Sequence, residues 1–254
     1  MRLKVVTSER MDDMVKWIGH RGESAEAPEN TLASFKLAME RDLDAIEVDI
    51  HLTADKKVVC SHDVNTLRRC GKDLVITETN FDELRKLDAG NGEKIPLFSE
   101  VLKVLRPGKQ AYVELKGVDQ ALIPAMMEVI DSVGVDHRQI VVIAFHPDMV
   151  RECKRLYPDL QVLLLIGIYR LDGGISVPNA ELAYALMQGC DADGMDIRSY
   201  PEVVDAELIR RVHAIGKTVT LWTVDDTSDA AYFVKLGVDG ITSNRAAAIR
   251  DELS

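Results

Sequence analysis

The stretch Ile18-Gly-His-Arg-Gly-Glu-Ser-Ala-Glu-Ala-Pro-Glu-Asn-Thr-Leu-Ala-Ser-Phe35 runs from a short apolar strand through a loop into a helix. Gly22 favours a turn after the strand, and Thr31 precedes apolar residues at helical spacing. His20 and Arg21 therefore lie where a strand ends. A titratable ring beside a guanidinium that can hold two oxygens suits a phosphate-handling site. A surface pair before a turn is the alternative that this stretch alone leaves open.

Outward from this unit, apolar β-branched runs alternate with longer amphipathic stretches, which is typical of βα units and a parallel sheet. The predicted strands are 15–19, 44–50, 58–62, 111–115, 140–145, 161–166, 193–197, 218–224 and 239–242. The predicted helices lie near 31–41, 99–105, 120–133, 147–157, 179–189, 205–215 and 227–236. This is one strand more than a closed eight-stranded barrel requires.

The extra strand is explained by a hairpin, because the gap between Ile50 and Val58 is too short for a crossover helix. Folding the chain symmetrically about Asp55 and Lys56 pairs Asp49 with His62 and leaves eight parallel strands. We therefore predict the α/β class and a TIM (β/α)8 barrel, with one domain over residues 1–254. The polar, glycine-containing stretch at about 65–96 interrupts the alternation and predicts a small insertion near the site.

The charge balance limits the partners of the chain. A formal net charge of −11 at pH 7 gives no long-range attraction to nucleic acid or anionic membranes, so Arg21 must act locally on an anionic substrate. The first ten residues lack the apolar core of a signal peptide, and no run reaches the length of a membrane span. The spacing of the four cysteines fits no zinc or disulfide framework. We expect a cytoplasmic protein with reduced thiols and no membrane insertion; oligomerisation stays open.

Three acidic residues predict a metal site. Glu47 and Asp49 lie two apart on one face of a strand, and Glu114 lies near the end of another strand, with Lys116 on its face. Three carboxylates without a thiolate suit Mg²⁺ or Ca²⁺ better than zinc. The alternative is a network of salt bridges that lines the mouth of a barrel.

A second histidine joins this group, because the predicted hairpin brings His62 beside Asp49. Two imidazoles beside a metal can deprotonate an attacking oxygen and protonate a leaving alkoxide. Asp63 is a candidate for orienting one of the rings. The pattern favours cleavage of a phosphodiester.

These residues resemble the glycerophosphodiester phosphodiesterase family, which is similar in fold to phosphatidylinositol-specific phospholipases C. The matching pieces are His20-Arg-Gly22, Pro28-Glu-Asn-Thr31, Glu47-Val-Asp49, Leu52-Thr53 with Asp55, His62-Asp63 with Leu67 and Arg68, Glu114-Leu-Lys116, and Leu221-Trp-Thr-Val224. The resemblance implies a TIM barrel with a small insertion after the His62 segment. It also implies that His20 and His62 are the acid and base, that Glu47, Asp49 and Glu114 hold the ion, and that Arg21 and Lys116 bind phosphate.

Some positions depart from the pattern of the family. Asn244 stands where the family commonly has Asp, Ala144-Phe145 replaces a frequent Ser-Phe, and Arg69-Cys-Gly71 replaces a threonine-rich continuation. These departures concern the alcohol part of the substrate. Trp222 is a weaker candidate for a wall of the glycerol pocket, and Asn30 either bonds in the mouth or caps a helix.

The leading hypothesis is metal-dependent hydrolysis of glycerophosphodiesters, small-molecule substrates, to an alcohol and sn-glycerol 3-phosphate. A related phosphodiesterase that forms a cyclic phosphate by internal attack is the first alternative. A catalytically silent, ligand-binding barrel is the second, although the intact histidines and acids argue against it. A metal-using aldolase or isomerase would also fit the fold, but it would not need both histidines.

Overall fold

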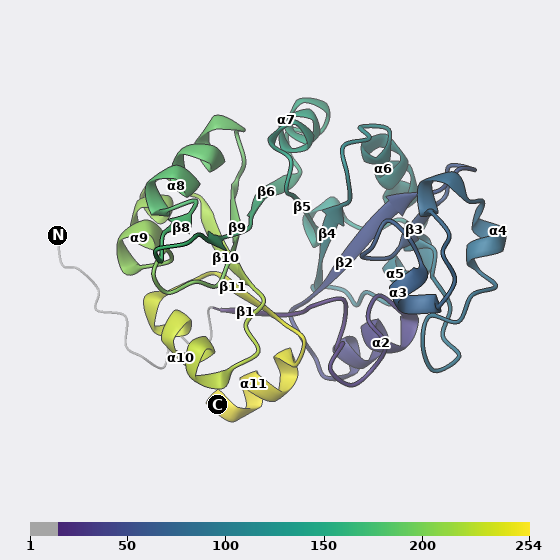
Figure 1. The fold of residues 1–254 in the computed structure, drawn as a ribbon, viewed down its shortest axis with the longest axis horizontal. Coiled ribbons are helices and arrows are strands. Elements are labelled where there is room, and N and C mark those ends of the chain that lie inside the picture. Colours follow the sequence, from purple (N-terminus) through teal and green to yellow (C-terminus); the bar gives the residue numbers. More distant parts are fainter. Residues whose placement is uncertain (1–14) are drawn as a thin grey trace.

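The computed structural model describes residues 15–254, so the expectation that the first residues lack a signal peptide lies outside it. A ring of helices surrounds a barrel of parallel strands (Figure 1). The parallel strands are β1 (Lys16–Gly19), β2 (Ala45–Leu52), β4 (Gln110–Leu115), β5 (Ile140–Ala144), β6 (Gln161–Ile166), β9 (Gly194–Arg198), β10 (Thr218–Trp222) and β11 (Gly240–Ser243). Strand β1 pairs with both β11 and β2, which closes the barrel and confirms the predicted fold.

Each barrel strand is followed by a helix that packs on the outside. These helices are α2 (Leu32–Glu40), α5 (Phe98–Leu102), α6 (Leu122–Val133), α7 (Pro147–Leu156), α8 (Ala180–Gly189), α9 (Ala206–Ala214), α10 (Thr227–Leu236) and α11 (Ala246–Leu253). Thr31 is the N-cap of α2 and accepts a hydrogen bond from the backbone N–H of Ser34. The sequence prediction missed α11 because its run of alanines carries little apolar periodicity.

Side chains alternate between the two faces of the barrel wall and build two cores. The outer core joins the strands to the helices and includes Phe35, Val48 and Phe98. The inner core fills the barrel, and its buried members are Ile18, Ala45, Tyr112, Val141, Ile143, Leu163 and Leu165. This packed interior leaves the carboxyl ends of the strands as the place for a site.

The hairpin after β2 corrects the predicted register. Strand β3 (Val58–Cys60) runs antiparallel to β2, and Ile50 lies opposite Cys60. The chain therefore folds symmetrically about Asp55 alone, so the predicted pairing of Asp49 with His62 is wrong by one residue. The backbone N–H of Thr53 donates to the carbonyl oxygen of Lys57, which leaves a three-residue loop, and Lys56 with its φ of 60° is the left-handed residue that such loops contain. The regular pairing ends at Cys60, so His62 is placed by a loop.

The stretch after this hairpin forms a small body of its own. It contains α3 (Leu67–Cys70), the 3₁₀ helix η1 (Ile76–Glu78) and α4 (Phe81–Leu84). A separate apolar cluster includes Val59 of β3 with Ile76, Leu84 and Ile95. The hydrophobic contact with β3 anchors the segment beside the loop that carries His62.

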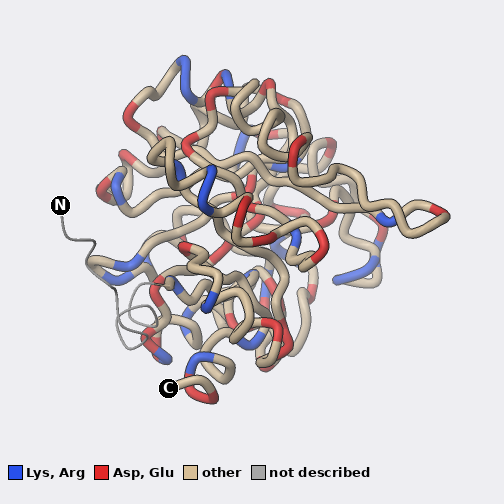
Figure 2. Tube along the Cα trace, turned by 90° about the vertical axis from the view of Figure 1, so that its left-hand side faces the viewer, with Lys and Arg blue, Asp and Glu red and all other residues tan. Residues whose placement is uncertain are grey.

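A second excursion contains two short strands that were not among the predicted ones. Strands β7 (Tyr169–Arg170) and β8 (Ser176–Val177) form a hairpin that projects from the body at the right of Figure 2. Basic and acidic segments are interspersed over the rest of the chain. Within residues 15–254, no helix is long and apolar enough to cross a membrane.

Candidate active site

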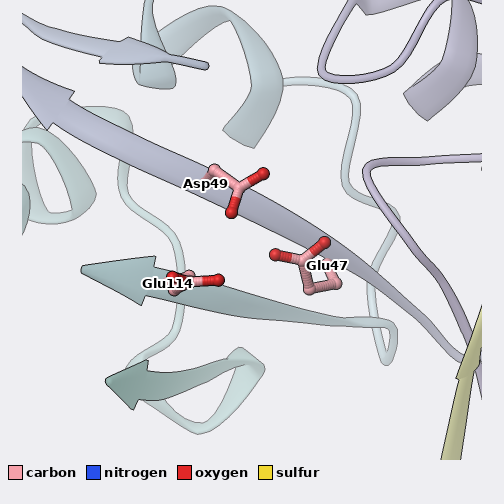
Figure 3. A group of neighbouring side chains, drawn as sticks. All are labelled: Glu47, Asp49 and Glu114. Carbon is pink, nitrogen blue, oxygen red and sulfur yellow. The ribbon is translucent and has the colours of Figure 1, made fainter. Parts of the chain in front are cut away.

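Three carboxylates meet at the carboxyl ends of two neighbouring strands. Glu47 and Asp49 project from β2, and Glu114 projects from β4, where it is the register partner of Asp49. One oxygen of each residue lies within 4.8 Å of the others, and the groups point toward a common space (Figure 3). All three side chains are buried.

Two cations compensate part of this charge. The Lys116 Nζ lies 2.8 Å from Asp49 Oδ1 and 2.6 Å from Glu114 Oε1. The Arg21 Nε lies 3.3 Å from Asp49 Oδ2, and the Arg21 backbone N–H donates to Glu47 Oε2 over 2.9 Å. The structure thus places both residues implied as phosphate ligands on the acidic cluster itself, and Arg21 also lines the cavity described below.

The pKa values of the acids show that this compensation is incomplete. Burial, followed by the charge of Asp49, raises the pKa of Glu47 and raises that of Glu114 to about 8. Burial also opposes ionisation of Asp49, but Lys116 and Arg21 outweigh it and hold its pKa below the usual range.

The donor set suits a divalent ion. Glu47 Oε1 is buried and has no hydrogen-bond partner among the described residues. Carboxylate oxygens are the ligands that Mg²⁺ and Ca²⁺ prefer, and a further positive charge would offset the repulsion among the acids. The residues present therefore fit the ion that the resemblance implies.

The His20 ring is held by Asn244, the residue that follows the last strand of the barrel. Its Nδ1 lies 2.7 Å from Asn244 Oδ1, and its Nε2 faces the acids at 3.9 Å from Glu47 Oε2. Asn244 is fixed in turn by Asp225, which accepts its backbone N–H over 2.8 Å, and by the hydroxyl of Ser24, which donates to Oδ1. Burial, followed by the charge of Arg21, lowers the pKa of His20 to about 4.

His62 lines the same cavity as His20. Its Nδ1 lies 2.7 Å from Asp63 Oδ1, and Arg68 binds the other oxygen of that carboxylate over 2.5 Å. Asp63 thus lies where it can orient the ring. Burial lowers the pKa of His62, although the charge of Asp49 opposes the shift.

A cavity of about 120 Å³ opens between these groups. It is lined by both histidines and by groups from around the barrel, namely Arg21, Glu47, Glu114, Ile143, Phe145, Leu165, Asp196, Trp222 and Thr242. The Trp222 ring packs edge-on against Phe145, with ring centroids 5.5 Å apart. Asn30 does not line this cavity: it is buried, and its Nδ2 donates to Asp49 Oδ2 over 2.7 Å.

Three residues near the site were missed or underrated from the sequence. His51 is buried and its Nε2 lies 3.3 Å from the carbonyl oxygen of His62, which fixes the backbone there. Asn244 was noted only as a departure from the family, because its contact with His20 spans 224 positions. Asp196 lay inside a predicted strand, and a lone acid at such a position gives no signal of its own.

The barrel and the juxtaposed histidines and acids define a phosphodiesterase of the TIM-barrel class. The model of the "Glycerophosphoryl diester phosphodiesterase family" matches residues 20–248. A glycerophosphodiester phosphodiesterase of Caldanaerobacter subterraneus subsp. tengcongensis is 30% identical over 242 residues, covering 89% of this chain and 93% of that protein. The chain belongs to this family and is an enzyme that hydrolyses glycerophosphodiesters.

Solved structures agree with this assignment. The structure of an Oleispira antarctica phosphodiesterase in complex with the product sn-glycerol-3-phosphate has a TM-score of 0.81 and 25% identity, covering 95% of this chain and 97% of that one. The structure of a "putative glycerophosphodiester phosphodiesterase" from Galdieria sulphuraria has a TM-score of 0.82 and 25% identity, with 99% of both chains covered. The expected fold and enzyme class are confirmed.

Proposed function

We propose that this chain cleaves glycerophosphodiesters to an alcohol and sn-glycerol 3-phosphate with a divalent cation and with His20 and His62 as base and acid. The observation that carries the proposal is the single cavity lined by both histidines and by acids of the buried cluster. The product-bound relative supports the identity of the phosphate product.

Glu47, Asp49 and Glu114 would hold the cation, Mg²⁺ or Ca²⁺. When bound, the ion supplies Lewis-acid stabilisation of the charge that develops on the phosphoryl oxygens. Lys116 and Arg21 reach the same acids and would turn toward the phosphate, where their charges add to that stabilisation.

The hydrogen bonds of the two rings support different roles for them in the proposed mechanism. His20 donates its Nδ1–H to the amide oxygen of Asn244, so its Nε2 keeps a lone pair that faces the site. This ring takes the proton of the attacking water. His62 has a carboxylate partner, Asp63, which stabilises the protonated ring better than an amide does. This ring gives its proton to the leaving alkoxide as the phosphorus–oxygen bond breaks.

The cyclic pathway is the second candidate. The 2-hydroxyl of the glycerol would attack phosphorus internally, and His20 would deprotonate that hydroxyl in place of water. The same two rings serve both routes. Direct hydrolysis is the simpler route, because it needs one displacement and no second opening step.

Phosphorus NMR of the products tests the proposal. Purified enzyme is incubated with sn-glycero-3-phosphocholine in ¹⁸O-water, with Mg²⁺ or Ca²⁺ and again with excess EDTA. We expect sn-glycerol 3-phosphate carrying one ¹⁸O atom, no cyclic resonance, and no turnover in EDTA. A transient cyclic phosphate would favour the internal route, and unchanged turnover in EDTA would remove the metal from the mechanism.

The remaining expectations from the sequence stay proposals. We propose a single catalytic domain in which the segment near 65–96 caps the cavity, with a cytoplasmic location and small-molecule substrates. Thr66 and Arg69 of the segment lie in a narrow crevice together with His62, which supports the position of the cap.

A further inference from the structure

The wall of the cavity opposite the acids contains a carboxyl group that the proposed mechanism does not use. Asp196 lies on β9, and its register partners are Leu165 on β6 and Thr220 on β10. It is 1% exposed and lines the same cavity as the histidines. One inward neighbour, Leu165, belongs to the apolar inner core, and the other, Thr220, is polar, so this acid lies at the edge of that core.

The polar groups on this wall, the Asp196 carboxyl and the Thr242 hydroxyl, have unused hydrogen-bonding capacity within residues 15–254. Among the described residues, the Asp196 carboxyl accepts one hydrogen bond, from the hydroxyl of Thr220 over 2.8 Å, and forms no ion pair. Thr242 on β11 also lines the cavity, is 1% exposed, and has a buried hydroxyl without a partner in the described part of the chain. Buried polar groups without partners destabilise a fold, and such exceptions concentrate at functional sites.

The chemistry of the wall indicates which group it binds. A hydroxyl both donates and accepts, so it can satisfy the free capacity of Asp196 and the orphaned oxygen of Thr242. Burial raises the pKa of Asp196 to about 7, so a large part of the group is uncharged near neutrality, which disfavours a cationic ligand. A quaternary ammonium would leave the Thr242 hydroxyl unpaired.

The size of the cavity indicates which half of the substrate it accommodates. About 120 Å³ accommodates a small group, whereas the alcohol half varies in size between glycerophosphodiesters and has to extend through the mouth. The glycerol half is common to all of them and carries free hydroxyls. We propose, on the basis of the proposed function, that Asp196 and Thr242 form a specificity subsite that hydrogen-bonds a glycerol hydroxyl.

The Thr242→Val variant tests the subsite, because valine keeps the shape and removes only the hydroxyl. Three substrates are compared: sn-glycero-3-phosphocholine, sn-glycero-3-phosphoglycerol and bis(4-nitrophenyl) phosphate, which has no hydroxyl. We expect kcat/KM for both glycerol substrates to fall about tenfold relative to the aryl diester, which corresponds to one lost hydrogen bond. The melting temperature should stay level or rise, because an unpaired buried hydroxyl is removed.

Thr218→Val is the matched control. Thr218 lies on the same barrel wall, and its buried hydroxyl likewise has no partner within residues 15–254, but it does not line the cavity. We expect similar stability effects from the two variants and a changed substrate ratio only for Thr242. The double variant D196L/T220V removes the carboxyl together with its donor and should lower the same ratio further.

The outcomes separate the subsite from the proposed function. If the wild-type enzyme cleaves neither glycerol substrate, the proposed function fails. If it cleaves both and neither Thr242→Val nor D196L/T220V changes their ratio to the aryl diester, the subsite is absent. A loss confined to the choline substrate would identify a cation site and overturn the assignment.

Discussion

The two walls of the cavity handle buried carboxyl groups in opposite ways. On the acidic wall, Asp49 is held ionised because Lys116 and Arg21 reach it. On the facing wall, the Asp196 carboxyl accepts a hydrogen bond only from the hydroxyl of Thr220 among the residues that the structure describes, and burial raises its pKa to about 7. Burial penalises the charge on both walls, so the neighbours decide the outcome. One wall is suited to holding charged groups and the other to recognising neutral ones.

Removing one charge from the acidic wall should have the largest effect. In Glu47→Gln the carboxylate loses its charge but keeps its size, so we expect activity to fall by about 10⁴-fold through loss of the metal. Mg²⁺ or Ca²⁺ should raise the melting temperature of the wild type and not that of the variant. Because Glu114 has a pKa of about 8, binding should release protons and strengthen as the pH rises.

The control for this variant is Glu128→Gln on the exposed face of α6. It changes the net charge by the same amount and should leave both the activity and the response to metal unchanged. A Glu47→Gln enzyme with wild-type thermal stabilisation by either cation would remove this residue from the metal site.

The histidines come next, with losses of about 10²–10⁴-fold on glycerophosphodiesters for His20→Ala and His62→Ala. Their roles separate with an aryl phosphodiester, whose leaving group needs no proton. His62→Ala should retain most of its aryl diester activity, whereas His20→Ala should lose activity on both substrates. His137→Ala, an exposed histidine paired with Asp131, is the control. Equal losses for both variants on the aryl substrate would contradict the assignment of acid and base.

The cap should have a smaller effect, because we propose that it contacts the substrate outside both walls. Replacing the segment near 65–96 by a glycine linker should broaden specificity, with ratios between head groups changing by about tenfold. We expect the wild type to prefer small water-soluble glycerophosphodiesters over intact phospholipids. Since truncation uncovers Val59, the point variant Arg69→Met, which breaks the contact with Glu29, is a milder test. An unchanged substrate ranking in two folded variants would exclude the cap from selection.

The prediction for the facing wall concerns stability and not turnover. A carboxyl whose pKa is raised in the folded state favours folding while it is protonated, so stability is full below pH 4 and declines until the pH passes about 7. Asp196→Asn should remove this decline, which amounts to at most about 4 kcal/mol. Tyr112 stays protonated over this range because burial raises its pKa. Denaturant midpoints of the two proteins between pH 4 and 8 measure the difference, and parallel curves would contradict the raised pKa.

Much of the barrel was predictable because strand and helix periods are local properties of the sequence. The eight parallel strands followed from apolar runs, and Glu47 with Asp49 followed from the alternation of a single strand. The same parity placed Lys116 on the side of Glu114, which the 2.6 Å ion pair bears out.

Other features depend on information that the sequence does not carry locally. The hairpin register was off by one because it depends on a left-handed Lys56, which is unusual for lysine. The support of His20 by Asn244 requires closure of the barrel, and the β7–β8 hairpin contains too few residues for a strand signal. The sequence also offers no reason to single out Asp196, because its proposed role depends on its position in the cavity opposite the acidic cluster.

The closure of the barrel has a consequence for when the enzyme becomes active during its synthesis. Strand β1 is synthesised early, but it pairs with β11 only when residues 240–243 have left the ribosome. The backbone N–H of His20 donates to the carbonyl oxygen of Ser243 over 2.8 Å. Asn244 follows directly. A growing chain therefore contains the three acids of the cluster and both histidines of the site long before Asn244 can hold the His20 ring in place. We expect activity to appear abruptly once these strand residues have left the ribosome. A chain whose synthesis stalls before them should be inactive.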